Sequence, residues 1–282
     1  MINALNSIPK RRLSFKVNAV IAANKITEDN TMNTKVKKDC KDIWNAFMCD
    51  GAVFDNEDIP YCPTTAGDIP KDIINWREAE GMHRRNIRNG KKDYFCDSFV
   101  CFYLHDHKFD GISGIWRKPK RTLEILRHFA GAITPDFSTY LDFPDPIKRY
   151  NTFRMRAFGY WLGRCGIEVI NNVRWGTPET YIYTFSGLPK HSILSIGTVA
   201  GSPHKLENRP IFNAGLEELV KRLKPHTIIT YGSAKYPCFE ILREQGIKVV
   251  EYKSRTARVF EEITIGKKNG VKIYEEASNE QG

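Results

Sequence analysis

The chain has 282 residues, of which 41% are hydrophobic and 12% aromatic, so it can pack the core of an α/β domain with extensions. No run approaches the ~18 to 20 apolar residues of a membrane-spanning helix, and the N-terminus lacks a signal-peptide pattern, so we expect a cytoplasmic protein with no membrane partner. The formal net charge of +10 and the pI of about 9.2 favour an anionic partner, and nucleic acid is the obvious class.

The cysteines give no sign of a disulfide or metal framework. There are seven of them, an odd number, and no two have CxxC spacing. Cys40, Cys49 and Cys62, taken with His83 or Cys96, match no compact zinc pattern. We therefore expect free thiols in a reducing compartment and no metal site.

Residues 1–95 show no repeating pattern of strands and helices, and we expect an irregular, partly helical and basic N-terminal region. A short helix is predicted over residues 38–47, and the stretch 55–73 is rich in the prolines and glycine that break regular structure. Residues 72–88 then have helical spacing, with Ile73, Ile74 and Trp76 on the apolar side.

The densest positive patch of the sequence is the run HRRNIRNGKK, which starts at His83. One interpretation is a solvated helix end without a partner. The other is a surface that contacts nucleic acid phosphates. The residues that would make those contacts are Arg84, Arg85, Arg88, Lys91 and Lys92.

From residue 98 onward, short apolar runs alternate with helical patterns. Strands are predicted over residues 99–104, 132–134, 167–173, 192–196, 227–229 and 247–252. Helices are predicted over residues 118–130, 146–165, 178–185, 212–223 and 236–244. Asp145 and Pro146 give the longest helix a strong start signal, and Gly166 ends it.

This alternation predicts an α/β fold with a parallel sheet. We expect about six parallel strands in a partial or distorted (β/α) barrel, with an open doubly wound sheet as the alternative. The core domain would span residues 96–255, between the N-terminal region 1–95 and a C-terminal segment 256–282. In that last segment two alternating stretches flank Asn269 and Gly270, which predicts a β-hairpin.

Nearly every predicted strand turns from apolar to polar at its carboxyl end, where parallel strands build their binding sites. The stretch GAITPDFSTYLDFPDP, residues 131–146, is the strongest case. We predict Asp136 and Asp106 as catalytic carboxylates. The ligand-binding candidates are Ser138, Tyr140, Asn151, Arg154, Arg174, Trp175, Thr198, Tyr231 and Ser233.

A purely structural interpretation of these polar residues remains open. Asp136 would then cap its turn and pair with Arg174, or with Arg154 from the following helix. His105 and His107 share a face if they extend a strand, so both imidazoles would be available to one metal ion, as in a nicking enzyme. The intervening Asp106 and the absence of a paired-tyrosine motif count against that function, and no cofactor is identified.

Six motifs together carry a resemblance to a known family. They are DIPYCPTTAGDIP, FVCFYLHDHKFDG, GAITPDFSTYLDFPDPIKRYNTFRMRAFGYWL, VINNVRWGTPETY, SIGTVAG and LKPHTIITYGS. The series, which covers most of residues 40–255, resembles the domain of unknown function 4417 family, found on phages, plasmids and conjugative elements of Gram-positive bacteria. The resemblance implies a mobile-element protein of the cytoplasm and transfers no catalytic residue or cofactor.

Three functions fit these patterns. The first is an enzyme that acts on a nucleic acid or nucleotide, with Asp136 as acid, base or nucleophile and Arg174 and Arg154 holding an anionic group. The second is a non-catalytic DNA-binding or replication-accessory protein that uses the basic run. The third is a phage-encoded binder or inhibitor of a host protein.

Overall fold

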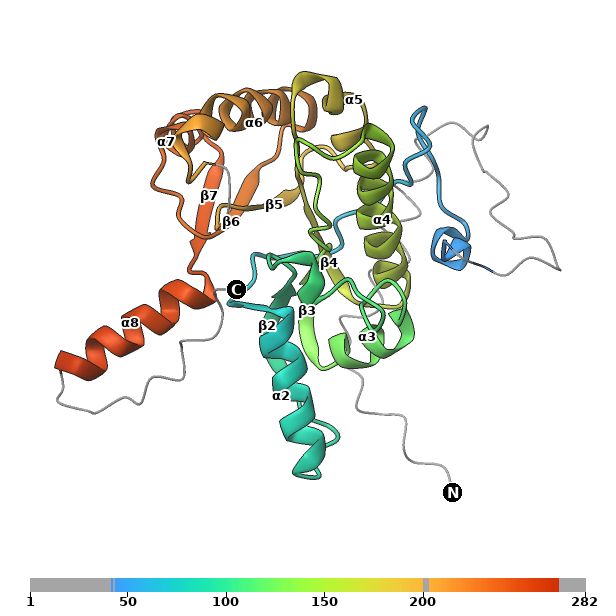
Figure 1. The fold of residues 1–282 in the computed structure, drawn as a ribbon, viewed down its shortest axis with the longest axis vertical. Helices are drawn as coiled ribbons and strands as arrows, with labels where there is room; N and C mark the ends of the chain where they lie inside the picture. Colours follow the sequence, from blue (N-terminus) through green and yellow to red (C-terminus); the bar gives the residue numbers. More distant parts are fainter. Residues whose placement is uncertain (1–41, 43, 200–202, 269–282) are drawn as a thin grey trace.

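The fold is an α/β half-barrel, seen in a computed structural model that describes residues 42, 44–199 and 203–268. Seven strands form one parallel sheet whose spatial order follows the chain from β1 to β7 (Figure 1). A doubly wound sheet reverses its strand order at a switch point, and this sheet has no such reversal. The sequence therefore predicted the correct α/β class, and the partial barrel is confirmed over the open doubly wound alternative.

The strands are short and the helices vary in length. The strands are β1 (Ile73–Asn75), β2 (Cys96–Cys101), β3 (Phe129–Ile133), β4 (Glu168–Asn172), β5 (Ile193–Gly197), β6 (Thr227–Tyr231) and β7 (Lys248–Tyr252). The α-helices are α2 (Trp76–Arg88), α3 (Pro119–Leu126), α4 (Asp145–Arg164), α5 (Tyr181–Thr184), α6 (Arg209–Leu223), α7 (Pro237–Glu244) and α8 (Arg255–Lys268). The 3-10 turns of the described residues are η2 (Ala46–Cys49), η3 (Asp106–Lys108), η4 (Pro178–Thr180) and η5 (Leu206–Asn208).

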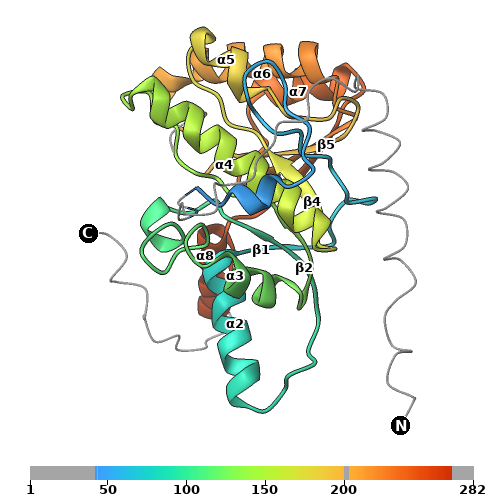
Figure 2. The ribbon, with the colours of Figure 1, turned by 90° about the vertical axis from the view of Figure 1, so that its right-hand side faces the viewer.

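The helices divide the outer side of the sheet into two halves. Figures 1 and 2 show α5, α6 and α7 together at the top of both views, with α2, α3 and α8 in the lower half. Two separate apolar clusters pack helices against the sheet, and α8 contributes to neither of them. One joins β2, β3 and β4 to α2, α3 and α4, and the other joins β5 and β6 to α5, α6 and α7.

The inner side of the sheet carries a third cluster, which shows how strongly the sheet curls. Side chains alternate along β2, so Val100 faces the outer helices while Phe99 and Cys101 face inward. The rings of Tyr103, just after β2, and Tyr231, at the end of β6, stack at 5.5 Å. Neighbouring strands lie about 4.8 Å apart, so strands four places apart in a flat sheet cannot bring their rings this close. The curl therefore makes the carboxyl ends of distant strands converge.

The first strand, β1, was not predicted. Ile73 and Ile74 belong to this strand, and only from Trp76 does the chain become helical. Asn75 marks the change, because its side chain accepts the Glu78 N–H at 3.0 Å and its own N–H donates to Glu78 Oε2 at 2.9 Å. This is a capping box, whose Asn-x-x-Glu signature is visible in the sequence. The sheet therefore begins at Ile73, inside the region expected to be irregular, and has seven strands rather than six.

The predicted C-terminal hairpin is wrong over residues 256–268, the part of that segment that the structure describes. Residues 255–268 form the helix α8, and the Asn269–Gly270 turn lies outside the described residues. Ser254 precedes the helix and its hydroxyl accepts the Ala257 N–H at 3.3 Å, as an N-cap does. Val259 and Ile263 are half-buried and four residues apart, which is helical rather than strand spacing.

The remaining predicted elements agree with the structure to within a few residues at most ends. The long helix begins at Asp145, one residue before the predicted start, with Pro146 in its first turn. The predicted helix over residues 38–47 lies partly outside the described part, which leaves out residues 1–41 and 43, and its last two residues belong to the short turn η2. Among the described helices none is long and apolar enough to cross a membrane.

Candidate functional site

A cleft of about 1710 Å³ opens at the carboxyl ends of the strands. Residues at or just after the end of all seven strands line it, and the helices α2 and α8 extend its walls beyond the sheet. We call this space the mouth cleft. Its position confirms that the polar strand ends converge, because in a parallel half-barrel all carboxyl ends face the same side.

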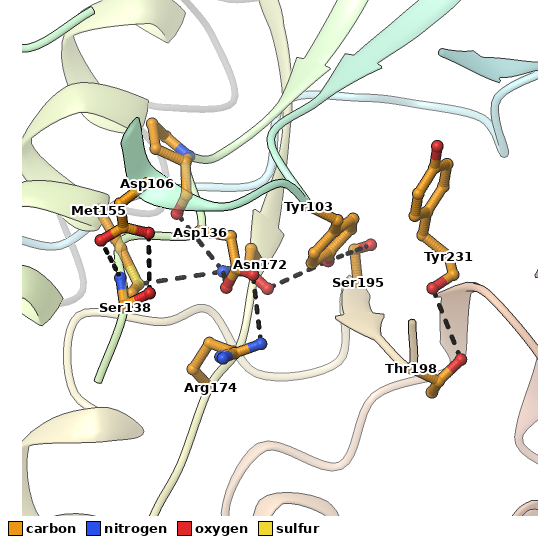
Figure 3. Close-up of polar contacts among 11 residues, drawn as sticks. Tyr103, Asp106, Asp136, Ser138, Met155, Asn172, Arg174, Ser195, Thr198 and Tyr231 are labelled. Carbon is orange, nitrogen blue, oxygen red and sulfur yellow. Dashed lines mark hydrogen bonds and ion pairs between the residues drawn. The ribbon is translucent and has the colours of Figure 1, made fainter. Parts of the chain in front are cut away.

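Asp136, the first predicted catalytic residue, lines the mouth cleft and is 7% exposed. Its Oδ1 accepts a hydrogen bond from Asn172 Nδ2 at 3.0 Å, and its Oδ2 pairs with Arg174 at 3.2 Å (Figure 3). Burial raises the pKa of the Asp136 carboxyl, while Arg174 and the Asn172 amide act in the opposite direction. The net effect of this environment is a pKa of Asp136 above its ordinary value, as is common for carboxyls that exchange protons at functional sites.

Asn172 links Asp136 to a second buried group. The Tyr103 hydroxyl lies 3.0 Å from Asn172 Oδ1 and 2.8 Å from the Ser195 hydroxyl (Figure 3). Because the Asn172 amide group must donate to Asp136, its oxygen accepts from Tyr103, and this fixes its orientation. Burial raises the pKa of Tyr103 well above its usual range, so the phenol keeps its proton. We call Tyr103, Asp136, Asn172, Arg174 and Ser195 the floor network.

Below the floor network lies Arg156, whose side chain is fully buried. Its guanidinium donates to the carbonyl oxygens of Asn172 at 3.0 Å, Thr184 at 3.0 Å and Ser186 at 3.2 Å. Desolvation lowers the pKa of Arg156 to about 10, so the group remains charged at neutral pH. Arg156 therefore joins the end of β4 to the end of α5 and the residues that follow it, and supports the floor network from behind.

Asp106, the second predicted catalytic residue, holds the loop after β3. Its Oδ1 accepts the Ser138 hydroxyl at 2.7 Å, and its Oδ2 accepts the Ser138 N–H at 3.1 Å (Figure 3). Its neighbours His105 and His107 line the mouth cleft, whereas Asp106 does not. The structure places Asp106 as a support for Ser138, which does line the cleft.

Asn151 and Arg154 lie behind the same loop and do not line the mouth cleft. Asn151 donates to the Ser138 carbonyl and accepts from Arg154 at 2.6 Å. Arg154 pairs with Asp110 at 2.7 Å and lies 3.8 Å over the Phe137 ring. The predicted ion pair of Arg154 with Asp136 is therefore wrong. Asp136 pairs with Arg174 instead, which was the other partner that the structural interpretation offered.

Trp175 and Tyr140 both line the cleft, but Trp175 is tightly packed whereas Tyr140 is exposed. The Trp175 ring packs 5.1 Å from the Phe212 ring, and a β-carbon added to Gly215 would come within 2.0 Å of it. Gly215 therefore makes room for this indole on α6, which fixes its orientation. Tyr140 is 47% exposed and meets Phe143 edge-on at 5.1 Å.

The last three ligand-binding candidates also line the cleft, at the ends of β5 and β6. The Thr198 hydroxyl donates to the Ser233 carbonyl at 2.9 Å, which joins the two strand ends. Tyr231 is buried, and its hydroxyl accepts the N–H of Arg255 at 3.0 Å. These contacts hold the cleft's shape on the side of β6.

The predicted basic patch splits into two parts. Arg84 and Arg85 on α2 line the mouth cleft, whereas Arg88, Lys91 and Lys92 lie further along the chain and do not. Lys235, beyond the end of β6, also lines it.

His105 and His107 lie at the rim with their rings stacked at 5.9 Å. Within residues 42, 44–199 and 203–268 no three His, Cys, Asp or Glu side chains are grouped to hold a metal ion.

Sequence reasoning selected Asp136 and Arg174 but not the groups that hold them. Tyr103, Asn172 and Ser195 went unselected because each lies within a stretch predicted as an otherwise apolar strand. The pair Asn171–Asn172 was the available signal, since two amides at the end of a buried strand need internal partners. Phe260 and the other α8 residues of the wall were missed because a hairpin was expected there.

The sequence is similar to a family model and to two phage proteins. A family model described as "Domain of unknown function (DUF4417)" matches residues 57–253. A "Gene 1 protein" of Mycobacterium phage D29 is 34% identical over 175 residues, 62% of this chain and 59% of that protein. A "Gene 1 protein" of Mycobacterium phage L5 is 33% identical over 136 residues, 48% of this chain and 57% of that protein. The chain thus spans less than two thirds of the length of both relatives, and no solved structure matches it significantly.

Proposed function

The chain belongs to the domain-of-unknown-function family DUF4417, and on that premise we propose that it binds nucleic acid in the mouth cleft and acts on it through Asp136. One observation carries the proposal. Arg84, Arg85 and Lys235 line the cleft with no carboxylate partner among the described residues. Exposed cations held in a concave surface attract phosphates and release the counterions of the nucleic acid.

The charge of the lining supports an anionic ligand. Eight arginines and lysines line the mouth cleft, against four aspartates and glutamates. Each of those carboxylates already has a partner: Asp136 has Arg174, Glu78 has Arg258, Glu261 has Lys253, and Glu251 accepts the Ala234 N–H at 2.7 Å. Because the cations outnumber the carboxylates, the lining of the mouth cleft has a net positive charge.

The floor network supplies the chemistry in this proposal. The Arg174 side chain is 28% exposed and binds Asp136 through only one of its nitrogens, so further N–H groups remain for a phosphate oxygen. Asp136, with a raised pKa, accepts a proton from the ligand or returns one at a carboxyl oxygen. Tyr103 and Asn172 keep that carboxyl in place while the proton moves.

The binding part of the proposal is tested by fluorescence anisotropy with labelled single-stranded DNA, duplex DNA and RNA over a salt series. We expect log K to fall linearly with log salt, and Arg84→Ala/Arg85→Ala to reduce the slope by ~1.4 for a single strand. Lys190→Ala/Lys248→Ala is the matched control. It removes the same charge at the amino ends of β5 and β7, away from the cleft, and should leave the slope unchanged. Absence of binding at low salt, or equal slopes for both variants, would overturn the proposal.

The catalytic part is tested by incubating the protein with each nucleic acid and following the mass of the product. Wild type should change the mass of the nucleic acid that it binds, and Asp136→Asn should not, while both bind it equally. A product that forms equally with Asp136→Asn would remove this carboxyl from the reaction.

A further inference from the structure

The helix α8 is an unusual wall for a cleft, because it is attached to the rest of the protein mainly through its first turns. The Arg255 N–H donates to the Tyr231 hydroxyl at 3.0 Å. Arg258 then donates to both carboxylate oxygens of Glu78 at 2.9 Å, which fixes α8 to the start of α2. Figure 1 shows the rest of α8 extending away from the sheet.

Phe260 follows the second anchor, Arg258, by two residues. Its side chain is 67% exposed, yet it lines the mouth cleft together with Ala257 and Glu261. A ring this exposed contributes little to the core. Tyr140, 47% exposed, offers a second accessible ring in the lining after β3.

The mouth cleft therefore presents two kinds of contact. Arg84, Arg85 and Lys235 offer charge to a phosphate backbone, while Phe260 and Tyr140 offer ring faces. A single strand has both free phosphates and free base faces, and proteins that bind single strands combine a basic groove with aromatic platforms. A duplex has already stacked its bases on one another, so exposed rings give it no comparable gain.

On the basis of the proposed function, we propose that the ligand of the mouth cleft is single-stranded nucleic acid, and that Phe260 on α8 stacks against one of its bases. Charge complementarity favours this occupant over a protein, because the cleft lining is net positive. The helix α8 then serves as the base-contacting wall, and α2 as the phosphate-contacting wall.

The test compares Phe260→Ala with wild type, using fluorescein-labelled oligothymidine of ~20 nucleotides and a duplex of the same length. Loss of one stacked base should weaken single-strand binding about 5- to 140-fold. The salt slope should stay the same, because no phosphate contact is lost. Duplex binding should not change.

Ile265→Ala is the matched control on the same helix. Ile265 is exposed and apolar but does not line the cleft, so its removal should leave both affinities unchanged. Phe260→Leu keeps an apolar side chain without the aromatic face and should bind as weakly as Phe260→Ala. Phe260→Trp should bind like wild type, and single-stranded DNA should quench the added indole fluorescence.

The outcomes separate this inference from the proposed function. If Arg84→Ala/Arg85→Ala reduces the salt slope while Phe260→Ala leaves single-strand affinity unchanged, nucleic acid binding stands and the stacking wall is refuted. Equal weakening of single-strand and duplex binding by Phe260→Ala would also refute the single-strand preference. If no nucleic acid binds wild type at low salt, both fail.

Discussion

The floor and the walls of the mouth cleft use their polar groups in opposite ways. On the floor, Asp136, Asn172 and Tyr103 satisfy one another through bonds of 3.0 Å, and little of them reaches solvent. On the walls, Arg84 and Arg85 remain exposed and without a carboxylate partner among the described residues. A satisfied, buried network fixes one geometry, whereas free exposed charges leave their binding energy for a ligand. The difference indicates that the floor determines chemistry and the walls determine affinity.

The largest expected effect is a loss of stability on removing Arg156, which supports the floor network from behind. Arg156→Ala leaves the carbonyls of Asn172, Thr184 and Ser186 without their donor and opens a cavity in a fully buried position. We expect the free energy of unfolding to fall by ~3 to 5 kcal/mol. Urea denaturation followed by circular dichroism measures this change.

The control for Arg156→Ala is a substitution of an exposed arginine on α2. Arg88 is exposed at the end of α2, so Arg88→Ala should change the free energy of unfolding by no more than about 0.5 kcal/mol. A loss below ~1 kcal/mol in Arg156→Ala would mean that the three carbonyls find other partners, and that the floor is not held from behind.

A smaller loss of stability is expected on removing the ion pair between Arg258 and Glu78, which joins α8 to α2. Arg258→Ala removes the contact with Glu78, a pair whose side chains are 28% and 24% exposed, and should cost only ~1 kcal/mol of global stability. Its local effect should be larger, because α8 then keeps few anchors. We expect faster proteolysis within residues 255–268 and weaker single-strand binding, with α2 and the floor unaffected. Unchanged proteolysis would show that α8 is held by other contacts.

The smallest expected effect is a pH trend from Asp136. Because burial raises the pKa of this carboxyl in the folded protein, the folded state holds its proton to higher pH than the unfolded state does. The contribution of Asp136 to stability is therefore greatest below its unfolded pKa and falls as pH rises through the raised folded pKa.

Asp136→Asn removes the titrating carboxyl, so comparing it with wild type tests the sign of this pH dependence of the free energy of unfolding. The difference in free energy of unfolding, wild type minus Asp136→Asn, should decrease as pH rises through this window. Urea denaturation of both proteins at several pH values measures it. A difference that grows with pH would show that Arg174 and Asn172 outweigh burial and lower the pKa of Asp136 instead.

The sequence predicted the sheet and the floor better than it predicted the walls. Apolar runs between turn signals located six of the seven strands, and Asp136 and Arg174 fell at converging strand ends because parallel strands share a direction. The pairing of Arg154 with Asp110 was beyond reach, since it depends on how a loop folds over Phe137. The wall helix α8 was missed because the alternation around Asn269 and Gly270 predicted a hairpin, and Ser254 was not recognised as a helix cap.

The most direct test of this division measures binding and turnover for a floor variant and a wall variant in parallel, against single-stranded DNA over one salt series. We predict that Asp136→Asn keeps the affinity and salt slope of wild type and loses turnover. We predict that Arg84→Ala/Arg85→Ala loses affinity and ~1.4 of the slope and keeps turnover at saturating ligand. Joint loss of affinity and turnover in both variants would show that the floor and the walls are not separate in function.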